Sequence, residues 1–182
     1  MVRLDGRTVL ILATSGFEES ELTGPKALLE AAGAKVRLAS PTMEPIRATV
    51  RDAPGIEVAP DLTIAEVQAT DWDALLLPGG VINPDALRRD RQAVDLVKAF
   101  VAADKPVGAI CHGPWMLVEA DVLRGRRAAG WPSIHTDMRN AGAVLVDQPA
   151  VTDGAIVTAR DPDDVPAFTA ALAEAIAARL IG

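Results

Sequence analysis

The sequence predicts an α/β fold in which a mostly parallel sheet carries helices on both faces. First, short apolar runs such as Thr8–Ala13 have the length and composition of strands buried on both sides. Second, helical stretches separate these runs, as Ser20–Ala32 does between Thr8–Ala13 and Lys35–Ala39. Third, 49% of the 182 residues are hydrophobic, which is enough for a packed core. We expect one domain over residues 1–182.

The first half of the chain holds two signals besides this βαβ unit. The helix Ser20–Ala32 meets a common terminator at Gly33, while Pro25 indicates that the helix begins there or that its first turn is irregular. The segment Pro41–Pro60 contains an internal Pro-Gly among β-branched residues, and it favours a small hairpin over a helix.

The middle of the chain continues the alternation of strands and helices. Asp73–Leu77 is predicted to be a buried strand, and Asp85–Ala103 a helix with Asp85 as its cap. Val107–Ile110 is the next strand. A helix follows to about Ala120, with the proline of Gly113-Pro114 in its first turn, where the missing N–H costs little.

The last part of the chain is predicted to contain a hairpin between two helical segments. A short helix is expected around Ile134–Asn140. Val151–Thr158 carries Asp153-Gly154 between β-branched runs, which is a strong hairpin signal. Asp161-Pro162 then caps a final Ala-rich helix that we expect to reach about Leu180.

Composition excludes several classes of function. The net charge of −7 and the absence of a basic stripe argue against specific nucleic-acid binding. The apolar runs are too short to span a membrane, and residues 1–6 are too short and polar for a signal peptide. A single cysteine excludes an intrachain disulfide and fits a reducing cytoplasm, where we expect the protein. One Cys and two His without ligand spacing predict neither a metal site nor a cofactor.

Three predicted strands end in loops that carry reactive or flexible residues. Ala13 leads into residues 15–19, Leu77 into Pro78-Gly79-Gly80, and Ile110 into Cys111-His112-Gly113-Pro114. In open α/β sheets, functional groups gather at the carboxyl ends of the strands. We therefore expect these three loops to converge.

Cys111 is the predicted reactive centre. It lies between a strand and a helix, which is the position of a nucleophile elbow, and Gly113 permits a tight turn. The positive end of the following helix predicts a lowered thiol pKa and more of the nucleophilic thiolate. The alternative is that a lone cysteine packs as a small buried hydrophobe.

Candidate partners of the thiol lie in the same loops. His112 is a candidate base, although neighbouring side chains usually diverge, and it could instead bond a backbone carbonyl or a partner chain. Glu18 is predicted to lie against the Cys111 sulfur and, if buried, to be protonated and donate to the thiolate. The alternative, an acid that complements the helix dipole, suits Glu19 and Glu21 better than Glu18.

The remaining candidates would line the substrate pocket. The N–H groups of Gly79 and Gly80 are placed to stabilise an oxyanion, although a Gly pair after a strand can also be only a turn. Trp115, which follows the elbow, is the third candidate pocket residue.

The string AICHGPWMLVEADVLRGRR at Ala109–Arg127 resembles the signature of the PfpI-type intracellular protease and general stress protein family. WPSIHTDMRNAGA, GFEESEL, LLPGG and VTDGAIVTARDPDDVPAF are similar to that family in order and spacing, over nearly the whole chain. The wider superfamily includes the parkinsonism-associated deglycase. The resemblance implies a flavodoxin-like three-layer sandwich with its cysteine in a strained elbow.

The resemblance also implies roles for individual residues. The family's nucleophile falls on Cys111, its adjacent histidine on His112 and its elbow glutamate on Glu18. A further acid from a neighbouring subunit falls on Asp85, where the protease branch usually has the longer Glu. Such a site would require a homodimer or a hexamer built as a ring of dimers.

Three functions follow from these residues. The favoured one is a cysteine-dependent stress-response enzyme that hydrolyses reactive carbonyls or glycated proteins, in the manner of a deglycase or glyoxalase. The second is an oxidative-stress sensor or chaperone that works through oxidation of Cys111 to sulfenic and sulfinic acid. The third is an oligomeric cysteine peptidase that pairs His112 with Asp85 across an interface.

Overall fold

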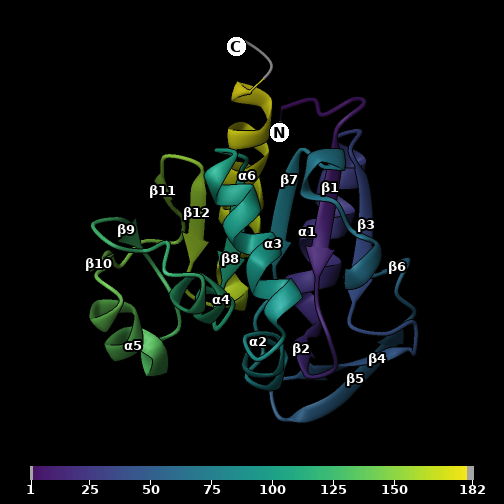
Figure 1. Ribbon diagram of the computed structural model, residues 1–182, viewed down its shortest axis with the longest axis horizontal. Coiled ribbons are helices and arrows are strands. Elements are labelled where there is room, and N and C mark those ends of the chain that lie inside the picture. The colour runs from purple at the N-terminus through teal and green to yellow at the C-terminus, as the bar shows by residue number, and fades with distance from the viewer. Residues whose placement is uncertain (1, 180–182) are drawn as a thin grey trace.

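A seven-stranded sheet lies at the centre of residues 2–179, the part of the chain that this computed structural model describes (Figure 1). Its strands are β1 (Thr8–Leu12), β3 (Lys35–Ser40), β6 (Leu62–Thr63), β7 (Ala74–Leu77), β8 (Val107–Ile110), β11 (Val151–Asp153) and β12 (Ile156–Ala159). They lie in the order β11-β12-β8-β7-β1-β3-β6, and only the edge strand β11 runs antiparallel to its neighbour. The predicted mostly parallel sheet is confirmed.

Helices cover both faces of this sheet. The α-helices are α1 (Glu19–Ala31), α2 (Ile82–Leu87), α3 (Arg91–Ala102), α4 (Pro114–Glu119), α5 (His135–Asn140) and α6 (Val165–Ala178). Helices α1 and α6 share one apolar core with the sheet, and α3, α4 and α5 share the other (Figure 1). The three-layer α/β sandwich is therefore the observed architecture.

Strand β1 shows why both faces are apolar. Val9 and Ile11 belong to the core under α1 and α6, whereas Leu10 and Leu12 belong to the core under α3. Successive side chains of a strand point to opposite faces, so a strand covered on both sides must be apolar at every position. All four of these side chains are fully buried.

A small second sheet lies at the end of the central sheet toward which β1 points (Figure 1). It consists of β2 (Phe17–Glu18), β4 (Ile46–Val50) and β5 (Ala53–Val58), and β4 and β5 form the predicted antiparallel hairpin. The second predicted hairpin is β11–β12, which turns at Gly154 with a φ of +60°. Strands β9 (Arg127–Ala128) and β10 (Val144–Leu145) pair in a further short ladder.

The predicted helix from Asp85 to Ala103 is wrong at its beginning. The chain forms α2 and α3 instead, and the residue that caps α3 is Asp90, whose Oδ1 accepts from the backbone N–H groups of Gln92 and Ala93 at 2.9 and 3.2 Å. Asp90 satisfies two of the N–H groups that a helix start leaves without partners. Asp85 lies inside α2, where it caps nothing.

Two other helices differ from expectation only at their ends. Helix α1 begins at Glu19, so Pro25 is an interior residue on its buried face. Helix α6 follows a 3-10 turn in which the Asp161 side chain accepts from the Asp163 N–H. The expected end near Leu180 lies outside the described residues. Among residues 2–179, every helix is too short or too polar to cross a membrane.

Candidate active site

The three predicted loops meet at Gly79. Its N–H donates to Oε2 of Glu21 at 2.7 Å, which joins the loop after β7 to the first turn of α1. A Cβ placed on Gly79 would lie 2.7 Å from Cβ of Cys111 and 2.5 Å from Oε2 of Glu21. Only glycine therefore allows this close approach, and the absence of a Cβ leaves the space in which the cysteine and the carboxyl group lie near each other.

Cys111 occupies a strained elbow between β8 and α4. Its φ is +62°, a left-handed conformation that costs a residue with a side chain about 1–3 kcal/mol. The surrounding backbone holds it there, because its N–H donates to the Ala159 carbonyl at 3.1 Å and its carbonyl accepts from the Trp131 N–H at 2.8 Å. The side chain is 5% exposed. Such strain is typical of a functional position.

His112 contacts the Cys111 sulfur within the same chain. Its Nδ1 lies 3.2 Å from Sγ, although adjacent side chains usually diverge. The left-handed backbone at Cys111 turns the two side chains to the same side. Nε2 lies 3.1 Å from Oγ of Ser133. Burial lowers the pKa of His112, so its neutral form is favoured.

Two tryptophan rings enclose the imidazole. The ring of Trp131 stacks on His112 at a centroid distance of 5.7 Å, and the ring of Trp115 is tilted against it at 5.5 Å. Trp115 is itself fixed by the hydrogen bond from its indole N–H to Oδ2 of Asp137 at 2.8 Å. Trp115, predicted as a pocket residue, therefore supports His112 directly.

The carboxyl group at the sulfur belongs to Glu21, and the expectation that placed Glu18 there is wrong. Glu21 is fully buried, its Oε2 accepts from the Gly79 N–H at 2.7 Å, and its carboxyl group lies near enough to the Cys111 thiol to raise the pKa of that thiol. Glu18 lies in β2, and its Oε2 accepts from the backbone N–H of Arg51 at 2.9 Å. Glu18 therefore holds the turn between β4 and β5, where Arg51 has a φ of +56°.

Glu21 keeps its proton near neutral pH. Burial raises the pKa of its carboxyl group to about 8, against the opposing effect of the Gly79 N–H. Its other oxygen, Oε1, is enclosed without a well-formed hydrogen bond among the described residues. A proton on Oε1 makes this buried atom a hydrogen-bond donor.

The pKa of the Cys111 thiol is raised, whereas the helix end predicted that it would be lowered. Burial is the largest cause, and a charged Glu21 raises the pKa further. The nearby backbone N–H groups of His112 and Gly80 act in the opposite direction and lower the pKa of the thiol. Below about pH 8 Glu21 is neutral, so its repulsion is absent and its O–H favours the thiolate.

The predicted pair of oxyanion donors also changes. The Gly79 N–H is occupied by Glu21, so it is not available to a substrate. The N–H groups of Gly80 and His112 lie close enough to the sulfur to lower the pKa of the thiol. Gly80 has a φ of +75°, and a Cβ there would lie 2.1 Å from the Gly16 carbonyl oxygen, which excludes any side chain.

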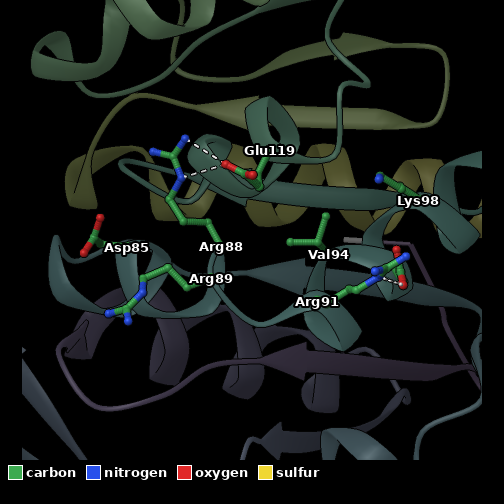
Figure 2. Close-up of a pocket in the computed structure, with 8 residues that line it drawn as sticks. Asp85, Arg88, Arg89, Arg91, Val94, Lys98 and Glu119 are labelled. Carbon is green, nitrogen blue, oxygen red and sulfur yellow. Dashed lines mark hydrogen bonds and ion pairs between the residues drawn. The ribbon is translucent and has the colours of Figure 1, made fainter.

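Asp85 lies away from this cluster. It lines an open pocket of about 710 Å³ with residues of α3 and with Arg88, Arg89 and Glu119. In Figure 2, Asp85 lies beside Arg88 and Arg89 at one end of the pocket, and Arg88 turns toward Glu119, which it binds at 3.0 Å. Among residues 2–179, the Asp85 carboxylate makes neither a hydrogen bond nor an ion pair.

The described residues show no group of three or more His, Cys, Asp or Glu side chains placed to hold a metal ion. His135 is partly buried, and its Nε2 lies 3.0 Å from the Gly130 carbonyl oxygen. Sequence reasoning missed Glu21, Trp131 and Ser133. Glu21 shares the buried face of α1 with Leu22, Pro25 and Leu29, and this helical spacing was the available signal.

Several known proteins are similar to this chain in sequence and in fold. Residues 7–175 match the model of the DJ-1/PfpI family. General stress protein 18 of Bacillus subtilis is 43% identical over 90% of this chain and 94% of its own length. Protein/nucleic acid deglycase 2 of Escherichia coli is 44% identical over 89% and 93%. The crystal structure of Drosophila melanogaster DJ-1beta has a TM-score of 0.82 and 26% identity, over 98% of this chain and all of that one.

Proposed function

The chain belongs to the DJ-1/PfpI family, and we propose that it is a cysteine-dependent hydrolase of small reactive carbonyls or of their early adducts on proteins. One observation carries this proposal: the sulfur of Cys111 lies in a strained elbow, 3.2 Å from Nδ1 of His112 and in contact with the buried carboxyl of Glu21. The names of the relatives, a deglycase and a general stress protein, support a stress-related role with this chemistry.

The first step is activation of the thiol. The Sγ proton passes to Nδ1 of His112, which forms an imidazolium beside a thiolate. Below about pH 8, the protonated carboxyl of Glu21 donates a hydrogen bond to that thiolate. The N–H groups of His112 and Gly80 already face the sulfur, so the negative charge forms among preorganised donors.

The second step is addition to the carbonyl. The sulfur forms a bond to the aldehyde carbon of a substrate such as methylglyoxal, and the carbonyl π electrons move to oxygen. The N–H groups of Gly80 and His112 are near enough to the sulfur to stabilise this oxyanion. A hemithioacetal results when the oxygen takes a proton from the imidazolium.

The later steps need water and no external oxidant. A proton leaves the former aldehyde carbon and another is added to the neighbouring carbonyl carbon, so the first carbon is oxidised and the second reduced. The product is a thioester of a 2-hydroxy acid on Cys111. Water cleaves the thioester and restores the thiol. His112 and Glu21 are the groups at the sulfur that can move these protons.

The exposure of Cys111 favours a small substrate. With 5% of its surface exposed, the thiol is accessible to a small aldehyde more readily than to an extended polypeptide. A peptidase would need an acid from a second subunit at His112, and Asp85 is the residue that would supply it. Intact unfolded polypeptide after incubation with purified protein would exclude the peptidase.

A redox sensor is the second candidate, because Glu21 lies against the sulfur with a proton to donate. In this account peroxide oxidises Cys111 to a sulfinic acid, whose oxygens accept from the Glu21 O–H. Intact mass after mild peroxide treatment tests it. A gain of about 32 Da, two oxygen atoms, on Cys111 is expected, and its absence would exclude the sensor.

Turnover of methylglyoxal tests the hydrolase. Wild type is expected to form a 2-hydroxy acid, and Cys111→Ala is expected to reduce that rate to the uncatalysed background. Glu18→Gln is a matched control, since Glu18 binds the β4–β5 turn instead of the sulfur. Unchanged activity in Cys111→Ala would refute the proposal.

A further inference from the structure

The second nitrogen of His112 has a partner in its own chain. While Nδ1 lies 3.2 Å from the Cys111 sulfur, Nε2 lies 3.1 Å from Oγ of Ser133. The imidazole is 6% exposed, so a ring nitrogen without a partner would lose hydration and gain nothing. The hydroxyl group therefore occupies the position from which a base is oriented.

The segment that carries Ser133 is attached to the elbow at several points. The Trp131 N–H donates to the Cys111 carbonyl at 2.8 Å, and the Trp131 ring stacks on His112. Pro132 begins the 3-10 turn Pro132–Ile134 and restricts its backbone, and Ile134 is fully buried in the core. The Ser133 hydroxyl is thus held at the imidazole by ordered residues on both sides.

The charged groups near the imidazole interact with partners other than His112. Asp137 on α5 accepts from the Trp115 indole. Arg88, the C-cap of α2, lies over the Trp115 ring while it binds Glu119 on α4. Glu21 on α1 lies at the sulfur. Among residues 2–179, no carboxylate hydrogen-bonds Nε2 of His112.

We propose that Ser133 is a positioning residue that completes a Cys111–His112–Ser133 relay within one chain. The inference rests on the proposed role of Cys111 as nucleophile. When the Sγ proton moves to Nδ1, both ring nitrogens carry protons, and the Nε2–H donates to Oγ of Ser133. The hydroxyl thereby stabilises the imidazolium and holds the ring so that Nδ1 faces the sulfur.

A hydroxyl group suits both states of the ring. It accepts from Nε2–H in the imidazolium, and by rotating it can donate to Nε2 in the other neutral tautomer. The Ser133 hydroxyl adds no negative charge beside the ring, so burial still lowers the pKa of His112. One consequence is that each chain activates its cysteine without an acid such as Asp85 from a second subunit.

The rate of Cys111 alkylation by iodoacetamide as a function of pH tests this proposal without any carbonyl substrate. Ser133→Ala is expected to lower the rate about tenfold near neutral pH, as for a hydrogen bond to a charged group. The rates should converge at strongly alkaline pH, where hydroxide removes the thiol proton without His112. Ser133→Thr keeps a hydroxyl and is expected to restore the rate.

Two controls make the result decisive. Thr136→Ala removes a hydroxyl from the same segment that bonds Arg139 and not His112, and it is expected to alkylate like wild type. Ser133 is exposed, so its change to Ala leaves the core intact. A Ser133→Ala rate equal to wild type, or lowered equally at every pH, would overturn the proposal.

Asp85→Asn separates this relay from one that spans two subunits. If Asp85→Asn causes the loss confined to neutral pH and Ser133→Ala does not, the positioning group is Asp85 and the proposal fails. If Cys111→Ala leaves methylglyoxal turnover intact, the hydrolase fails, while the alkylation rates still decide the role of Ser133.

Discussion

At the scale of single residues, the chemistry depends on a buried pair of acids, Cys111 and Glu21. Both lie against Gly79, and neither is exposed enough for water to stabilise its charge. Two negative charges so close together inside the protein repel strongly, so the pair carries at most one negative charge near neutral pH. Glu21 holds its proton, so a thiolate that forms when His112 takes the thiol proton receives a hydrogen bond from the carboxyl group.

The raised pKa of Glu21 predicts a cost to stability that grows with pH. Its ordinary pKa is 4.5 and its folded value is about 8, so between these values the unfolded chain binds fewer protons than the folded one. The free energy of unfolding therefore falls as pH rises through this window.

Glu21→Gln, which cannot ionise, should remove this loss. Its free energy of unfolding relative to wild type, measured in urea, should increase between pH 4.5 and 8 by on the order of several kcal/mol. Glu18→Gln is the matched control, because it removes a carboxylate that binds the Arg51 backbone N–H instead of lying at the sulfur. A constant difference for Glu21→Gln would show that Glu21 is ionised in the folded protein.

Residue chemistry was predictable from the sequence only in part. The elbow position of Cys111 followed from a strand, a cysteine and a Gly-Pro helix start. Which of Glu18, Glu19 and Glu21 reaches the sulfur depends on where α1 begins and which of its faces is buried. Glu18 and Glu21 are only three residues apart, yet Glu18 binds the β4–β5 turn and Glu21 lies at the sulfur. Ser133 lies 21 residues from His112, and no local pattern joins them.

At the scale of elements, helix caps decide where α2 ends and α3 begins. Both Asp85 and Asp90 precede helix-forming residues, so the sequence alone favoured a longer helix. A new helix, α3, begins after Asp90, because the Asp90 side chain accepts from the free N–H groups of Gln92 and Ala93. Asp85 cannot do so from the middle of α2. The strands were easier to predict, since burial on both faces requires continuous apolar runs.

Asp90→Ala should destabilise the protein by about 1 kcal/mol through loss of this cap. Asp85→Ala is the matched control: it changes an exposed Asp of the preceding helix that caps nothing, and it should alter stability by less than about 0.5 kcal/mol. Urea unfolding of both variants makes the comparison. Equal losses would contradict the assignment of the cap.

At the scale of the whole molecule, two apolar cores pack against opposite faces of the sheet and hold the strands that end at the active site. Phe168 of α6 is fully buried and lies against Gly108 of β8, the strand that ends in the elbow. A Cβ on Gly108 would lie 2.9 Å from the Phe168 ring, so the helix packs directly on the strand backbone. Packing of this density resists the movement that would relieve strain at Cys111.

Phe168→Ala should therefore cost about 3–5 kcal/mol of stability, the range for loss of a buried aromatic ring. Glu174→Ala, on the exposed side of the same helix, should cost less than about 0.5 kcal/mol. Thermal and urea unfolding report both values. A small loss for Phe168→Ala would mean that α6 is not packed on β8 as described.

The proposed chemistry depends on the pairing of Cys111 with Glu21, and the pH dependence of Cys111 alkylation tests this pairing. In wild type and in Glu18→Gln, the rate should show an inflection near pH 8, where Glu21 loses its proton and stops donating to the sulfur. In Glu21→Gln that inflection should be absent. An inflection that persists in Glu21→Gln and disappears in Glu18→Gln would contradict the account.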